Sequence, residues 1–219
     1  MRRLPRTLTS TLSVLLLAAC AGGMGMGGGN SMSFFVTSAN PGKGADFGGI
    51  AGADQYCQSL ASAAGAGGKT WRAYLSATGA TPVNARDRIG RGPWYNAKGT
   101  MVAANVDELH GTNQISKATA LTEKGDAVMG RGDAVNMHDV LTGSTPDGRA
   151  TAGGTADTTC GNWTKSGEGS AIVGHHDRTG LDESAPAKSW NSSHASRGCS
   201  LPQLKATGGD GRLYCFAAN

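Results

Sequence analysis

The sequence predicts an α+β domain with short helices, small antiparallel sheets and long loops stapled by two disulfides. Three observations lead to this fold class: glycine makes up 35 of the 219 residues, only 12 residues are aromatic, and four of the five cysteines lie beyond residue 50. Glycine disfavours the interior of helices, which argues against an ordinary helical bundle. The glycines follow no three-residue period, which excludes collagen. A loop-built domain with few aromatic residues gains stability from covalent cross-links.

The first residues of the chain predict a lipoprotein leader. Residues 1–19 carry three arginines and then an apolar stretch too short to span a bilayer, as in a secretory signal peptide. The leader ends in Leu17-Ala18-Ala19-Cys20, which resembles the bacterial lipobox. This resemblance implies cleavage before Cys20 and attachment of acyl chains (palmitate among them) to it. The other interpretation is an ordinary secretory peptide in which Cys20 stands there by chance.

The mature protein is expected in the cell envelope, anchored to a membrane by its lipid. Ala21 follows Cys20 in place of the aspartate that commonly retains lipoproteins in the inner membrane, so we expect the outer membrane. Residues 20–31 form the lipidated cysteine and a glycine-rich tether, and residues 32–219 form one domain. Three of the 20 basic residues leave with the leader, so 17 remain against 16 acidic ones. This near-neutral balance does not indicate a nucleic-acid partner.

The first elements of the domain follow from apolar periodicity. Residues 34–36 (Phe-Phe-Val) predict an opening strand. Apolar residues recur at helical spacing over 50–64, which predicts a helix with Asp46 as its N-cap and a stop at the glycines that follow. The alternation in residues 71–75 predicts a strand with positions 71, 73 and 75 on one face.

The rest of the domain is expected to consist mostly of loops. A second short helix is predicted over 105–109, and residues 213–216 (Leu-Tyr-Cys-Phe) read as a closing strand. Between them, residues 118–212 are mainly Gly, Ser, Thr, Asp and Asn, broken by short apolar pieces. Such a long loop region in a compact domain is functional or cross-linked.

Four cysteines remain for cross-linking once Cys20 carries lipid. An even number in an exported domain implies two disulfides, for which three connectivities exist. We favour Cys57–Cys215, which ties the early helix to the last strand, and Cys160–Cys199, which staples the loop region. A four-cysteine zinc site is a poor alternative, because no two of these cysteines are spaced as C-x-x-C.

These features together resemble the C-type-lectin-like superfamily, and within it the endostatin-like branch of exported bacterial proteins. The resemblance covers about residues 33–216 and implies the same nested disulfide pairing. The pieces that carry it are residues 34–38 (FFVTS), 48–54 (GGIAGAD), 71–76 (WRAYLS), 142–143 (TG), 160–164 (CGNWT) and 213–216 (LYCF). The Glu-Pro-Asn or Gln-Pro-Asp triplet of calcium-dependent sugar binders is missing. The resemblance therefore implies a lectin-like fold without the usual calcium-dependent activity.

The densest cluster of polar residues lies between Cys160 and Cys199. Imidazole and carboxylate groups suit a polar ligand or a transition metal. The candidate ligand-binding residues are His175, His176, Asp177, Trp190, Asn191 and His194. Adjacent histidines on a strand point to opposite sides, so His175 and His176 reach one metal only if they lie in a turn. The other interpretation is a solvated or hydrogen-bonded structural loop.

The sequence therefore predicts a non-enzymatic, lipid-anchored envelope protein that recognises a glycan or protein partner. No cofactor is expected, and a bound metal ion remains an alternative. A metal-dependent envelope hydrolase that uses His175, His176 and Asp177 is the alternative from another class. A purely structural envelope lipoprotein is the third.

Overall fold

The computed structural model describes residue 1, residues 31–152 and residues 156–219. The elements are β1 (Phe34–Val36), α1 (Gly49–Ala63), β2 (Trp71–Ala73), the 3-10 turn η1 (Ala85–Asp87), β3 (Trp94–Tyr95), β4 (Met101–Ala103), α2 (Val106–His110), β5 (Asp139–Leu141), α3 (Cys160–Trp163), β6 (Ile172–His175), β7 (His194–Ala195), α4 (Leu201–Lys205) and β8 (Gly209–Ala217). This is an α+β fold, as predicted. The predicted leader after Met1, Cys20 and the tether up to residue 30 lie outside the described residues. None of the described helices has the length and hydropathy needed to cross a membrane.

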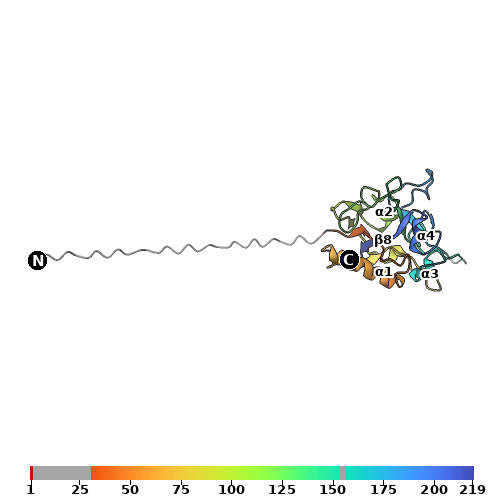
Figure 1. The fold of residues 1–219 in the computed structure, drawn as a ribbon, viewed down its shortest axis with the longest axis horizontal. Coiled ribbons are helices and arrows are strands. Elements are labelled where there is room, and N and C mark those ends of the chain that lie inside the picture. The colour runs from red at the N-terminus through yellow and green to blue at the C-terminus, as the bar shows by residue number, and fades with distance from the viewer. Residues whose placement is uncertain (2–30, 153–155) are drawn as a thin grey trace.

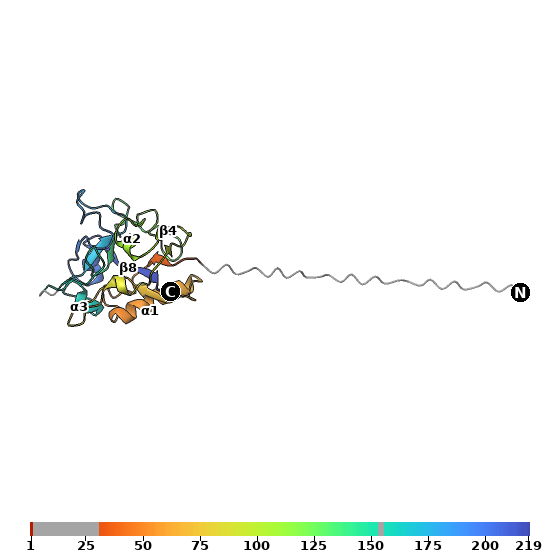
Figure 2. The same cartoon turned by 180° about the vertical axis from the view of Figure 1, so that it is seen from behind.

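The nine-residue strand β8 organises the larger sheet. Its neighbours give the order β1-β8-β5-β6-β7, and β2 pairs with β8 as well, while β3 and β4 form a separate two-stranded sheet. β8 lies between α1 on one side and α2 on the other in both views of the fold (Figures 1 and 2). The expectation of purely antiparallel sheets is wrong in one respect, because β5 runs parallel to β8. The long connection between these two strands allows a parallel pairing, which a tight hairpin does not.

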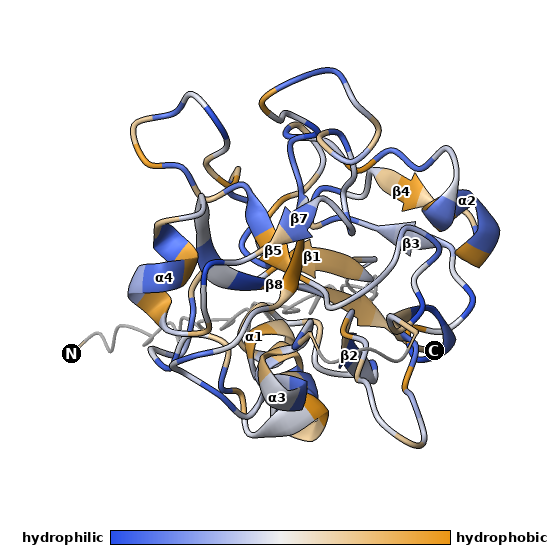
Figure 3. Cartoon of the chain, turned by 90° about the vertical axis from the view of Figure 1, so that its right-hand side faces the viewer, coloured by the Kyte–Doolittle hydropathy of each residue, from blue (hydrophilic) through white to orange (hydrophobic). Residues whose placement is uncertain are grey.

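Both faces of the central strands are buried, so the domain has two apolar clusters. Along β8, Leu213 and Cys215 belong to the cluster beneath α1, whereas Tyr214 and Phe216 belong to the cluster on the opposite face. This division follows from the two-residue period of a strand. Figure 3 shows the apolar residues of β1, β5 and β8 at the centre, with polar residues on the surrounding loops. On β8, the rings of Tyr214 and Phe216 contact those of Phe34 and Trp190.

The early helix forms where its periodicity predicts, with a different start. α1 begins at Gly49, and the residue before it, Gly48, adopts a left-handed conformation without capping by a side chain. The prediction of Asp46 as N-cap is wrong: its Oδ1 accepts a hydrogen bond from the Gly48 N–H at 2.9 Å and closes a turn ahead of the helix. The left-handed turn at Gly48 separates the aspartate from the first helical residue.

The alternation predicted after the helix is confirmed. β2 ends at Ala73, two residues earlier than expected, but Trp71, Ala73 and Leu75 all belong to the cluster that packs against α1. Tyr74 points to the opposite cluster, where its ring lies 4.8 Å from that of Trp190. The short helix predicted over 105–109 is found as α2, with Asn105 as its cap.

Both predicted disulfides are present. Cys57 on α1 is bonded to Cys215 on β8, and Cys160 is bonded to Cys199 across 39 residues of the loop region. The latter bridge starts in α3, a tight turn in which Gly161 and Asn162 are left-handed. The loop region predicted over 118–212 is therefore stapled, and it contributes β5, β6 and β7 to the sheet.

Asp54 on α1 joins the helix to the sheet through buried charges. Its Oδ2 lies 2.8 Å from Arg72 and 2.6 Å from Arg88, and its Oδ1 accepts the Ala73 N–H at 2.9 Å. The Asp54 side chain is 9% exposed, and that of Arg88 is 15% exposed. Removal of such a partner leaves a charged group with little access to water.

Asp54→Ala is expected to lower the free energy of unfolding by about 3 kcal/mol, because Arg88 and the Ala73 N–H lose their acceptor. Urea denaturation followed by tryptophan fluorescence measures this loss. Arg72→Ala is the matched control and should cost less than about 1 kcal/mol, because Arg72 is 43% exposed. Equal losses in the two variants would contradict this view of the ion pair.

Candidate functional site

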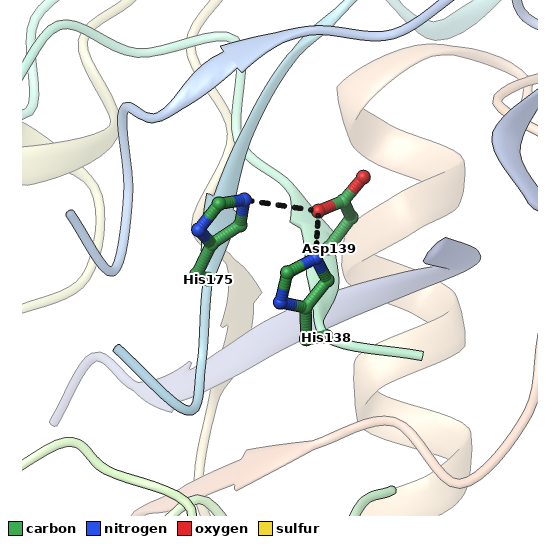
Figure 4. Close-up of side chains that lie close together, drawn as sticks. All are labelled: His138, Asp139 and His175. Atoms are coloured by element: carbon green, nitrogen blue, oxygen red, sulfur yellow. Dashed lines mark ion pairs between the residues drawn. The ribbon is translucent and has the colours of Figure 1, made fainter. Parts of the chain in front are cut away.

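The pairing of β5, β6 and β7 brings three histidines and an aspartate together. Asp139, the first residue of β5, lies directly opposite His175, the last residue of β6. His138 precedes Asp139, and Figure 4 shows the imidazoles of His138 and His175 directed at the same carboxylate. His194 begins β7, where it lies opposite Val173 of β6. Val173 and His175 are two residues apart on one strand, so His194 and His175 lie on the same face of the sheet.

The Nε2 atoms of the three histidines surround one oxygen of Asp139. His138, His175 and His194 place Nε2 at 3.2, 3.3 and 3.5 Å from Asp139 Oδ1. The His175 and His194 Nε2 atoms are 3.0 Å apart. Ligands that bind a tetrahedral zinc ion at about 2.0–2.2 Å lie about 3.3–3.6 Å from one another. The separations of His138 Nε2 and His175 Nε2 from Asp139 Oδ1 are therefore about those of ligands that share one metal ion.

The carboxylate of Asp139 is buried without a well-directed hydrogen bond. Its side chain is 2% exposed, and neither oxygen has a hydrogen-bond partner among the described residues. Burial acts to raise the pKa of Asp139, but contacts with His175 and His194 outweigh burial and lower it. The contact with Asp139 also raises the pKa of His194. A buried anion without a hydrogen bond is stable only beside positive charge, which a bound cation supplies.

Two further contacts orient the buried histidines. His138 Nδ1 lies 3.3 Å from Asp177 Oδ1, and His175 Nδ1 lies 2.7 Å from the carbonyl oxygen of Ala187. Both partners accept hydrogen bonds, so each Nδ1 is placed to donate to them while each Nε2 faces Asp139. Carboxylate and carbonyl partners of this kind orient histidine ligands in metal sites.

A pocket opens beside the cluster. Its volume is about 390 Å³. The lining residues are Arg131, His138, His175, Gly180, Leu181, Asp182, Ser184, Pro186, Ala187, Ser193, His194 and Thr207. The His138 and His175 side chains are only 3–4% exposed, whereas that of His194 is 39% exposed. The buried cluster therefore has one side that reaches solvent, and His194 stands on that side.

The structure separates the residues that sequence analysis grouped as one site. His175 and His194 line the pocket, and Asp177 lies behind it as the partner of His138. His176 is fully buried and directs Nε2 toward the carbonyl of Met129 at 3.2 Å, away from the cluster. Burial lowers the pKa of His176 to about 4. The two histidines diverge because His175 ends a strand and successive strand residues face opposite sides.

Asp177 is held as a carboxylate by the surrounding donors. Burial acts to raise its pKa, but His138 and the backbone amides of Arg131 and Thr179 outweigh burial and hold the pKa well below its usual value. The amides donate to Asp177 at 2.7 and 3.0 Å. Asp177, which the sequence suggested as a direct ligand, therefore contacts the far side of the His138 ring and not the centre of the cluster.

Trp190 and Asn191 lie in the core and not on the pocket. Trp190 is 3% exposed and packs on Tyr74 and Tyr214. The Asn191 amide donates to the Tyr74 hydroxyl at 3.0 Å and to the carbonyl of Pro146 at 3.1 Å. These contacts give both residues a structural role beneath the site.

Sequence analysis missed His138 and Asp139, which supply half of the cluster. The signal was present as an adjacent His-Asp pair immediately before the apolar residues Val140 and Leu141. Because the chain has only five histidines, each of them is a candidate ligand. The pairing of β5 with β6, which places this dipeptide next to His175, is not encoded in either segment alone.

No protein-family model matches the chain, and no curated protein matches it either. The function is therefore inferred from the site itself and from the sequence of the leader.

Proposed function

We propose that this protein is a lipid-anchored envelope protein that binds a ligand in the histidine pocket, and that the pocket operates with a bound transition-metal ion. The lipobox-like leader supports the location in the envelope. The nested disulfides and the short elements around β8 support a C-type-lectin-like fold. The partner is a glycan or a protein that presents a polar group to the pocket, as the polar residues of the loop region suggest.

One observation carries the metal proposal: three histidine Nε2 atoms surround a buried, unpartnered carboxylate oxygen. His138, Asp139 and His175 each offer one ligand atom, and these atoms lie within 4.8 Å of one another. Imidazole together with one carboxylate suits zinc or a neighbouring transition metal, whereas calcium and magnesium prefer shells of oxygen. The alternative constellation of His175, His176 and Asp177 has less support, because His176 faces Met129.

The proposal is tested by titrating zinc into the full chain, purified in detergent without a histidine tag and stripped with a chelator. Calorimetry is expected to give one zinc ion per chain. His175→Gln should weaken binding at least about 10-fold, because one of three buried ligands is lost. His176→Gln is the matched control and should bind zinc like the wild type. Circular dichroism verifies that both variants are folded.

Two results would overturn the proposal. One is a stripped wild-type protein that takes up neither zinc, cobalt nor copper. The other is a loss of binding in His176→Gln with full binding in His175→Gln, which would restore the constellation suggested by the sequence alone.

A further inference from the structure

The histidine cluster has a closed side and an open side. Asp139, His138 and His175 are at most 4% exposed, and the contacts with Asp177 and Ala187 hold the two histidines from behind. His194 is the exception, because its side chain is 39% exposed at the pocket. Structural zinc sites have four fixed ligands, whereas sites that bind a substrate have three and one exchangeable position.

His194 is placed where an exchangeable ligand would be. Its Nε2 lies 3.0 Å from that of His175 and 3.5 Å from Asp139 Oδ1, so it lies next to two of the three ligand atoms. Among the described residues, its Nδ1 has one hydrogen-bond contact, with the carbonyl of the next residue, Ala195, at 3.2 Å. His194 lacks the buried carboxylate or loop carbonyl from a distant segment that orients the other two histidines.

The charge of the open side fits an anion. A divalent metal has one more positive charge than the single carboxylate ligand Asp139 neutralises. Arg131 lines the same pocket, and its guanidinium has no ion pair within the described part of the chain. Asp182 is the acidic residue among the residues that line the pocket, and its carboxylate already accepts the Ser184 N–H at 2.9 Å.

The shape and lining of the pocket fit a small molecule with an apolar part. Leu181, Pro186 and Ala187 contribute apolar side chains to the lining of the pocket. Leu181 is 86% exposed, although leucine usually buries its side chain. A volume of about 390 Å³ is at the lower end of small-molecule sites.

From these observations we infer that the metal held by His138, Asp139 and His175 keeps one exchangeable position, which His194 occupies and which a small oxygen-donor anion with an apolar group takes from it. Arg131 attracts the anion, and the apolar side chains that include Leu181 cover its apolar part. The inference rests on the metal site proposed above and adds the class of molecule that binds there.

Cobalt substitution tests this inference, because the visible absorption of Co²⁺ reports its ligands directly. The full chain is loaded with Co²⁺ and titrated with acetohydroxamate, which binds a metal ion as a small oxygen-donor anion. Saturable changes in the cobalt spectrum are expected, and neutral acetamide at the same concentrations should cause none. Arg131→Gln should weaken acetohydroxamate binding about fivefold, as expected for loss of one exposed charge.

His194→Ala tests whether His194 is an exchangeable or a permanent ligand of the metal. The variant should retain cobalt with at most about 10-fold weaker affinity. It should also bind acetohydroxamate more tightly than the wild type, since no imidazole competes. Loss of cobalt as complete as in Asp139→Asn, or a spectrum that acetohydroxamate leaves unchanged, would overturn the inference. Metal uptake by the wild type is measured first, so failure of the metal site is distinguished from failure of the exchangeable position.

Discussion

Asp139→Asn is expected to weaken zinc binding about 100-fold or more, because the substitution removes the carboxylate around which the three Nε2 atoms are arranged. The amide keeps the shape of the side chain but not its charge. Competition with a chromophoric chelator measures the affinity of the full chain. Asp182→Asn is the matched control, since it changes an aspartate on the exposed rim of the same pocket and should leave zinc affinity unchanged.

The same substitution is expected to have little effect on the free energy of unfolding of the metal-free protein. The metal-free wild type contains a carboxylate that is 2% exposed and lacks a directed hydrogen bond. Its replacement by a neutral amide should therefore cost the metal-free protein little stability, because relief from burying the charge offsets most of the loss of the contacts with His175 and His194. Zinc at 100 times its dissociation constant should stabilise the wild type by about 2.7 kcal/mol and the variant hardly at all. A large loss of stability in the metal-free variant would instead indicate that Asp139 serves the fold.

Removal of the Cys57–Cys215 bridge by a double substitution to alanine should lower the free energy of unfolding by about 5 kcal/mol. The bridge closes 158 residues, and in the chain-entropy model the stabilisation grows with the logarithm of that length. The Cys160–Cys199 bridge closes 39 residues, so its removal should cost about 1 kcal/mol less. Both values come from denaturant unfolding of the two double variants.

The order of these two losses is the informative result. Cys57 and Cys215 connect α1 to the central strand, so their removal frees the helix from the strand that organises the sheet. A larger loss for Cys160 and Cys199 would contradict the chain-entropy account. It would indicate that the loop region around the site depends more on its staple than the sheet does.

Several elements could be predicted because their signals are local. The spacing of Ala53, Cys57 and Ala61 defines the buried face of α1. The alternation over residues 71–75 places Trp71, Ala73 and Leu75 in one core and Tyr74 in the other. Both patterns depend on the period of one element. The cap of α1 could not be read in the same way, because Asp46 and Gly48 belong to a turn whose geometry depends on the chain around it.

For this protein, the sequence by itself determined the α+β class, the early helix, the closing strand and the two disulfides. Each depends on local periodicity or on a small set of cysteine pairings. Only the tertiary structure decided the composition of the site. It joined His138 and Asp139 to His175 and His194, and it turned His176 away. The physical reason is register: which residues share one face of a sheet depends on how strands distant in sequence pair, and a shift by one residue exchanges the faces.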